Sequence, residues 1–252
     1  MSTMPPERLQ NSPLRSVLAQ IRFSHEPRLY NEGPILAQIH DCMRDRFPRM
    51  SQESQVTIAL GPGAAQQQAS PAWRMANRDR TASVLLTSES VSLETTAYTA
   101  WDDFSAELRN VLACLSTAID IPLRERVGLR YINEVRDDVH SALDWQARIN
   151  PALLGIIPAP QVGPRLMHSL TEARFRSDGS VTALRYGAVH EAAVSGLNVP
   201  FFLLDIDCYD DQPVDFDLAA TLALLSDFNL RVWSLFRWSL TDAYYARLRG
   251  PQ

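Results

Sequence analysis

In the first half of the chain, short stretches alternate between hydrophobic and polar residues, as strands do. Two longer stretches have apolar residues at the spacing of a helix. In residues 16–24 (SVLAQIRFS) every second side chain is apolar, which is the pattern of a strand with one buried face. Pro34 suits the first turn of a helix, and the apolar residues after it recur at helical spacing. The expected elements are a strand at 16–24, a helix from Pro34 to Phe47, a strand at 55–60, a surface loop at 61–71, two or three strands within 73–98, a helix at 100–118, a strand at 126–136 and a short helix at 141–149.

The second half carries one strong turn signal and one long helical pattern. Asp178-Gly179 lies between two stretches expected to be strands, 166–176 and 181–191, and this dipeptide is typical of a tight β-hairpin turn. The remaining elements are a strand at 201–209 and a long C-terminal helix capped by Asp215 or Asp217, whose core-facing residues are Leu218, Leu222, Leu225, Val232, Phe236 and Leu240.

These elements predict an α+β fold with a mainly antiparallel, curved sheet, helices packed on one face and a long C-terminal helix. Most strands follow one another directly, which favours antiparallel pairing over a doubly wound sheet. Four prolines between 150 and 164 indicate a connector. The expected organisation is a loose lead-in at 1–13, a first half at 14–150, a Pro-rich connector at 151–164 and a second half at 165–252, with the halves packed as one unit.

The composition is that of an ordinary globular protein, with one exception that removes several enzyme classes. Hydrophobic residues make up 46% and charged residues 21% of the chain, which is enough for a substantial core. All 24 basic residues are arginine. A P-loop, a protein kinase and a pyridoxal enzyme each need a lysine, so these classes are excluded. No G-x-S-x-G motif is present and no cofactor is expected, so the sequence leans against an enzyme without deciding the question.

The sequence also bears on location. No stretch approaches the roughly 18 apolar residues of a membrane span, and residues 1–10 lack the apolar run of a secretory signal. We therefore expect a cytoplasmic protein with no membrane partner. Cys42, Cys114 and Cys208 are odd in number and far apart, so free thiols are expected, with no disulfide and no zinc spacing.

Five short segments form a recognisable combination along the chain: P-L-x-x-V-x-x-Q-I-R-F at 13–23, Phe47-Pro48, V-S-L-E-T-T-A-Y at 91–98, W-x-x-F at 101–104 and G-L-R-Y-I-N at 128–133. Together they resemble a sporadically distributed bacterial protein family of unknown function. The resemblance covers nearly the whole chain and is strongest between residues 13 and 135. It implies a bacterial protein carried with mobile or defence genes or with a toxin–antitoxin pair, and it supplies no catalytic residues.

Arginines in the middle of expected strands are the first candidate site. Arg22, Arg130, Arg174 and Arg185 are such residues, and Asn133 follows near a strand end. If they converge on one sheet face, their guanidinium groups could bind phosphate or carboxylate at two points. The alternative is an exposed sheet face on which carboxylates lie opposite the arginines.

Asp205 and Asp207 are the candidates for a metal site, because residues two apart on a strand point to the same side. A divalent cation could use such a pair. The residues after them do not match a calcium-binding loop, and the histidines show no metal spacing, so no metal is expected. Salt bridges to the strand arginines are the structural alternative for these two aspartates.

Aromatic residues crowd the end of the last helix, and they cannot all face the core. We expect some of them to form a surface for self-association, such as a homodimer, or for a protein partner: Trp233, Phe236, Trp238, Tyr244 and Tyr245. A non-enzymatic interaction protein is therefore the first functional hypothesis. A phosphate- or nucleotide-binding protein or enzyme that uses the arginines is the second. Nucleic acid is a less favoured partner, because the net charge is −5.

Overall fold

The computed structural model describes residues 6–30, 33–61, 64–136, 142–192 and 198–250. Its strands form an open, antiparallel ten-stranded sheet with helices, so the expected α+β class is confirmed. The strands are β1 (Leu14–Phe23), β2 (Arg49–Gly61), β3 (Ala64–Ala76), β4 (Ala82–Leu86), β5 (Ser90–Thr95), β6 (Leu123–Val135), β7 (Thr171–Ser177), β8 (Ser180–Ala192), β9 (Asn198–Asp210) and β10 (Val214–Asp215).

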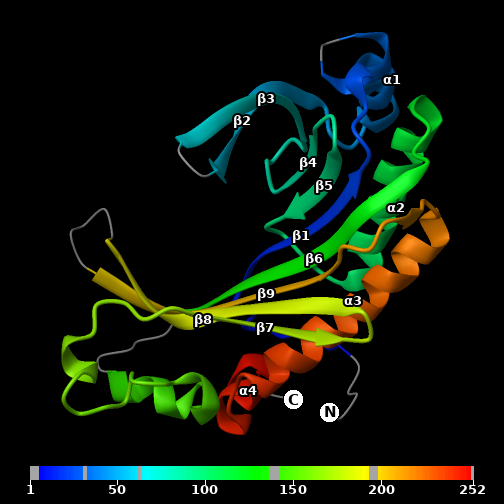
Figure 1. The fold of residues 1–252 in the computed structure, drawn as a ribbon. Coiled ribbons are helices and arrows are strands. Elements are labelled where there is room, and N and C mark those ends of the chain that lie inside the picture. The colour runs from blue at the N-terminus through cyan, green and yellow to red at the C-terminus, as the bar shows by residue number, and fades with distance from the viewer. Residues whose placement is uncertain (1–5, 31–32, 62–63, 137–141, 193–197, 251–252) are drawn as a thin grey trace. The chain divides into compact units, whose positions relative to one another are not determined.

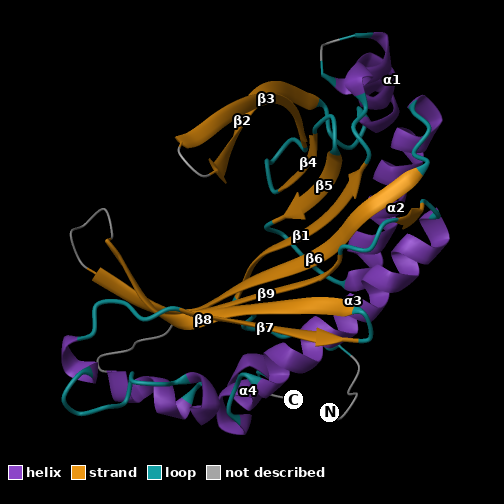
Figure 2. Ribbon diagram, viewed as in Figure 1, coloured by secondary structure: helices purple, strands orange, loops and turns teal. Residues whose placement is uncertain are grey.

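The order of strands in the sheet is β2-β3-β4-β5-β1-β6-β9-β8-β7, with β10 paired to β6 (Figure 1). The helices among the described residues are α1 (Pro34–Met43), α2 (Trp101–Ala118), α3 (Leu218–Trp238) and α4 (Asp242–Arg249) (Figure 2). The expected long C-terminal helix is α3. It begins after Asp217, whose carboxylate accepts a hydrogen bond from the Ala220 N–H at 2.6 Å, as a helix cap does.

Chain contacts divide the protein into two compact units. The first unit contains residues 1–17, 129–209 and 226–252, and the second contains residues 18–128 and 210–225. The Pro-rich residues 151–164 belong to the first unit, where they include the 3-10 turn η3 (Pro151–Leu153) and the start of η4 (Gly163–Arg165). No helix among the described residues is long and apolar enough to cross a membrane.

Most elements lie where the hydrophobic pattern predicts them. In β1 the apolar positions Val17, Ala19, Ile21 and Phe23 are all buried, so the alternation that indicated a strand also gives its core face. The turn between β7 and β8 is confirmed as well. Asp178 and Gly179 have φ values of 49° and 82°, the left-handed backbone that a two-residue hairpin turn needs.

One local prediction is wrong, and one is right in position but differs in the type of helix. The surface loop expected at 61–71 is mostly strand, because β2 and β3 form one long hairpin with register from Arg49↔Ala76 to Gly61↔Ala64. Trp73 and Met75 are buried at the end of the hairpin nearest the core. Beyond them the two strands stay paired through backbone hydrogen bonds, which do not depend on the type of side chain. The short helix expected at 141–149 is the 3-10 helix η2 (Ala142–Ala147), and residue 141 lies outside the described residues.

Candidate binding cleft

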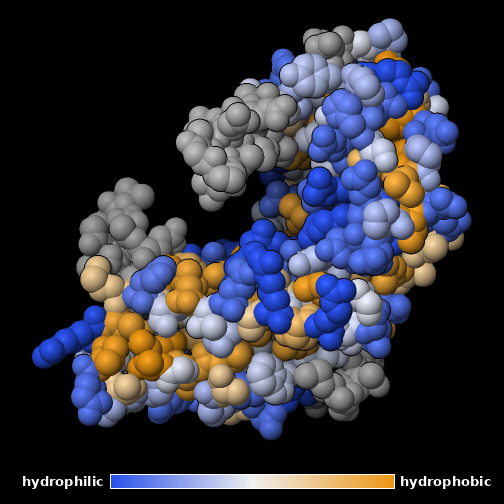
Figure 3. Space-filling model, in the orientation of Figure 1, coloured by the Kyte–Doolittle hydropathy of each residue, from blue (hydrophilic) through white to orange (hydrophobic). Residues whose placement is uncertain are grey.

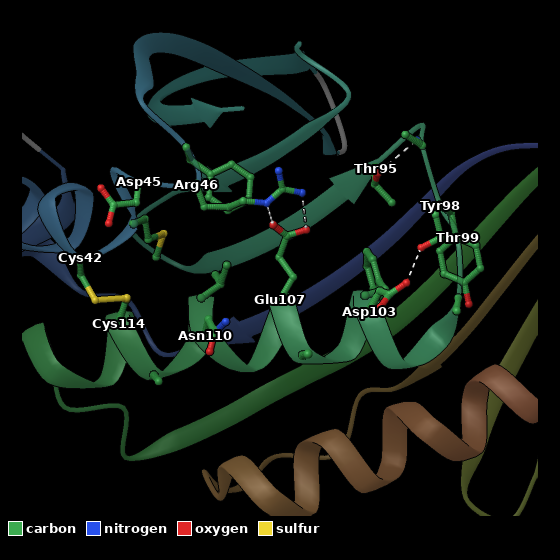
Figure 4. Close-up of a pocket in the computed structure, with 18 of the residues that line it drawn as sticks. Cys42, Asp45, Arg46, Thr95, Tyr98, Thr99, Asp103, Glu107, Asn110 and Cys114 are labelled. Carbon is green, nitrogen blue, oxygen red and sulfur yellow. Dashed lines mark hydrogen bonds and ion pairs between the residues drawn. A yellow bond between two sulfur atoms is a disulfide. The ribbon is translucent and has the colours of Figure 1, made fainter. Parts of the chain in front are cut away.

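A cleft of about 710 Å³ lies along one face of α2 in the second unit. The side of α2 that carries Phe104, Leu108 and Leu115 is buried in the core. The other side lines the cleft (Figure 4), and its residues are exposed except for Glu107, which is only partly exposed: Asp103, Ala106, Glu107, Asn110 and Ala113. Helical spacing of apolar residues thus fixes one face of α2 to the core and leaves a polar, small-residue face for the cleft.

Two short segments form the walls of this cleft. One is the turn that follows α1, with Asp45, Arg46 and Phe47, and the other is the loop from Thr95 to Ala100 between β5 and α2. Apolar side chains close the bottom, and they are buried: Met43, Phe47, Phe104 and Val111. The cleft therefore combines an apolar bottom with a polar rim, as ligand sites of roughly 300–1,000 Å³ do.

The charge of the cleft is negative, because three carboxylates and one guanidinium line it. Arg46 reaches across to Glu107, and its Nη2 lies 3.3 Å from Glu107 Oε2 (Figure 4). The hydrogen bond to Glu107 raises the pKa of Arg46 above its ordinary value, against the effect of burial. Asp103 accepts a hydrogen bond from the Thr99 hydroxyl at 2.6 Å. Asp45 and Asp103 are both exposed and give the rim its excess negative charge.

A disulfide between Cys42 and Cys114 lies at one end of the cleft and links α1 to α2 (Figure 4). Their Cα atoms are 5.7 Å apart although 72 positions separate them in the sequence. The expectation that all three cysteines are free thiols is therefore wrong for this pair, and only Cys208 is free. Spacing along the chain carries no information about two helices that pack side by side. Because disulfides are rare in the cytosol, the pair does not favour a cytoplasmic location, which stays a prediction.

None of the four strand arginines lines this cleft, and each of them lies near a carboxylate. Arg130, Arg174 and Arg185 belong to the first unit, whereas Arg22 belongs to the second and lies 3.9 Å from Glu89. Arg130 makes two hydrogen bonds of 2.7 Å to Asp205, and this pairing raises the pKa of Arg130 although burial opposes it.

Glu172 holds the other two arginines of that sheet face. Its carboxylate accepts hydrogen bonds from Arg185 at 2.6 Å and from Arg174 at 2.5 Å, and these bonds lower the pKa of Glu172. Arg185 also lies 3.3 Å from Asp205. This is the arrangement of the structural alternative, with a carboxylate opposite each arginine. Anion binding at this face stays a prediction.

The other polar candidates of the first unit have structural partners. Asn133 is buried and donates a hydrogen bond to the Leu204 carbonyl at 3.2 Å. Asp205 is only 3% exposed and is the partner of two arginines. Asp207 is two residues further on the same strand and contributes to the raised pKa of Arg130. Among the described residues no group of three or more His, Cys, Asp or Glu side chains could hold a metal ion.

The aromatic residues of the C-terminal helices are mostly interior. Phe236, Tyr244 and Tyr245 are buried, and Trp233 packs against Tyr245 with 6.4 Å between ring centroids. Of the five, Trp238 alone is classed as exposed, at 39%. Trp238, at the end of α3, is thus the most exposed of the five, and the interaction surface stays a prediction.

Apolar side chains of the first unit are exposed instead between residues 156 and 170. Figure 3 shows apolar side chains gathered in the region where Figure 1 draws this segment, at the lower left of both views. The exposed residues are Ile156, Val162, Met167 and Leu170. The sequence pattern indicated a connector here, so hydrophobic periodicity gave no signal for an apolar surface.

No protein-family model matches this chain, and no match was found among the curated proteins. The resemblance stated from the sequence motifs stays a prediction.

Proposed function

We propose that this protein is a non-enzymatic binding protein, and that the cleft along α2 holds a basic, partly apolar segment of a partner protein. The observation that carries the proposal is the combination of an apolar bottom with a lining that holds three carboxylates and a single arginine. A segment with arginine or lysine beside a bulky apolar side chain complements both properties.

The cleft is large enough for a peptide segment, and its walls are linked to each other before any ligand binds. A volume of about 710 Å³ accommodates several side chains of an extended segment. The disulfide ties α1 to α2 at one end, and the Arg46–Glu107 pair links the turn after α1 to α2 across the cleft. Walls held by such links lose little conformational entropy when a ligand binds, which favours affinity.

On the resemblance to scattered bacterial proteins, the partner would belong to a defence or toxin–antitoxin system. The second hypothesis, phosphate or nucleotide binding at the strand arginines, has less support, because Asp205 and Glu172 already hold Arg130, Arg174 and Arg185. A ligand anion would have to displace those carboxylates.

The test uses two labelled peptides and fluorescence anisotropy at low salt. One peptide alternates arginine with leucine and phenylalanine, and the other replaces each arginine by glutamate. We expect the basic peptide to bind and the acidic peptide not to. The double variant Asp45→Asn/Asp103→Asn removes the excess negative charge but keeps the Arg46–Glu107 pair, and it should weaken binding about tenfold.

The matched control is Asp41→Asn/Asp102→Asn. These two carboxylates are exposed on α1 and α2, and neither lines the cleft. The control changes the net charge of the chain by the same amount, so it should leave the affinity nearly unchanged. Equal binding of the two peptides, or an equal loss in both double variants, would overturn the proposal.

A further inference from the structure

A second cavity, in the first unit, has the opposite charge. It has a volume of about 450 Å³ and three walls. Residues 11–15, which lead into β1, form one wall, Glu134 and Arg136 at the end of β6 form the second, and Tyr244, Arg247 and Leu248 of α4 form the third. None of the arginines singled out from the sequence lies in it.

The lining of this pocket carries three arginines and one carboxylate: Arg15, Arg136, Arg247 and Glu134. Arg15 Nε and Arg136 Nε both donate to the same oxygen, Glu134 Oε2, at 2.7 and 2.8 Å. Burial acts to raise the pKa of Glu134, but these two hydrogen bonds outweigh it and lower the pKa. Glu134 is therefore ionised at neutral pH, and the lining holds three guanidinium groups and one carboxylate in a chain whose net charge is −5.

Backbone and side-chain contacts hold the three walls together. The Glu134 N–H donates to the Pro13 carbonyl at 2.9 Å, and the Asn11 N–H donates to the Leu248 carbonyl at 3.0 Å. The Arg136 guanidinium lies over the Phe201 ring, with its carbon 4.4 Å from the ring centroid. The pocket is thus formed before any ligand arrives, which lowers the entropic cost of binding.

We propose that this pocket binds a phosphate group, either as free phosphate or as the monoester of a small molecule. A phosphate group suits a lining with more guanidinium groups than carboxylates, because guanidinium groups bind phosphate oxygens through paired N–H donors. A volume of about 450 Å³ leaves room beside the phosphate for a group such as a sugar. Glu134 holds the guanidinium groups of Arg15 and Arg136 and would compete with the ligand for them.

Isothermal titration calorimetry of the full chain with three probes tests the proposal: inorganic phosphate, ribose 5-phosphate and ribose. We expect ribose 5-phosphate to bind and ribose not to bind. If inorganic phosphate binds as tightly as the ester, free phosphate is the ligand. If the ester binds more tightly, a phosphorylated small molecule is the ligand. No binding of either phosphate compound at millimolar concentration would overturn the proposal.

Three variants, with a loss, no change and a gain of affinity expected, distinguish an effect on phosphate binding from an effect on the fold. Arg15→Gln/Arg247→Gln removes two exposed cations from the pocket and should abolish phosphate binding. Arg165→Gln/Arg176→Gln removes two exposed arginines of the same unit outside the pocket and should leave binding unchanged. Glu134→Gln removes the internal competitor and should tighten phosphate binding about fivefold or more. Weaker binding in Glu134→Gln, or an equal loss in both arginine variants, would contradict the assignment.

Discussion

Arg130 on β6 and Asp205 on β9 form a two-point ion pair across neighbouring strands, with both N–O distances at 2.7 Å. The Asp205 side chain is 4% exposed and that of Arg130 is 37% exposed. A buried carboxylate is stable only when its charge is compensated, and Arg185 adds a second cation at 3.3 Å. The arginines that suggested an anion site in the sequence therefore serve first as partners of the protein's own carboxylates.

Removal of the Asp205 carboxylate should destabilise the first unit. Asp205→Ala leaves Arg130 without its main partner in a half-buried position, and the expected loss in the free energy of unfolding is about 3 kcal/mol. Glu172→Ala removes an exposed partner of the same Arg185 and should destabilise the protein less than Asp205→Ala does, because solvent screens the exposed pair. Urea denaturation of both variants checks this difference, and equal losses would show that burial does not decide the effect.

The Cys42–Cys114 bond should contribute strongly to stability. A cross-link between residues 72 apart restricts the unfolded chain. The resulting loss of unfolded-state entropy stabilises the folded protein by about 4 kcal/mol. Cys42→Ala/Cys114→Ala should lower the free energy of unfolding by an amount of that order. A reductant should destabilise the unmodified protein to a similar extent and have no effect on the double variant. A protein that is insensitive to reductant would contradict the cross-link.

The remaining thiol should be unreactive in the folded protein. Cys208 is buried, and burial raises the pKa of its thiol to about 11, so almost none of it is thiolate at neutral pH. A thiol reagent should label no cysteine in the native protein, one after unfolding without reductant, and all three after unfolding with reductant. Labelling of native Cys208 would mean that its strand opens readily.

Stability should fall at high pH through Tyr245. Burial, together with a hydrogen bond from its hydroxyl to Glu7, raises the pKa of Tyr245 to about 12 from an ordinary value of 10. A pKa that is raised in the folded state gives stability that is present below pH 10 and is lost as the pH rises from about 10 to 12. The decline in unfolding free energy over this window should be smaller in Tyr245→Phe. An unchanged decline would assign it to other groups.

Gly187 should not tolerate a side chain. Its φ is +147°, and a Cβ there would lie 1.8 Å from the Ser169 carbonyl oxygen, where residues 168–169 run close to β8. Gly187→Ala should lower the free energy of unfolding by about 3 kcal/mol or more, because the backbone at Gly187 or Ser169 must move to make room for the Cβ. Gly155→Ala is the control, since its φ is +52° but no atom lies within 4 Å of the added Cβ. That change should cost only about 1 kcal/mol, and denaturant unfolding distinguishes the two.

Local patterns in the sequence determined most elements of this fold. Alternation placed Val17, Ile21 and Phe23 on the core face of β1, and Asp178-Gly179 located the hairpin turn. Helical spacing predicted α2 nearly to its ends. These properties depend on interactions within a few residues, because backbone geometry fixes which neighbouring side chains share a face. The outer part of the β2–β3 hairpin was not predicted as strand. It is held by backbone pairing, and the Gly, Gln and Ala residues there have no strand pattern.

Tertiary structure alone decided which distant side chains meet. It joined Cys42 to Cys114, gave Arg130 its partner 75 positions away, and brought Arg15 and Arg247 into one pocket with Glu134. Sequence reasoning chose arginines for being in strands, yet the pocket arginines lie at strand ends and on a helix. Charge pairing depends on distances of a few ångströms between groups far apart along the chain, and only the path of the folded backbone sets those distances.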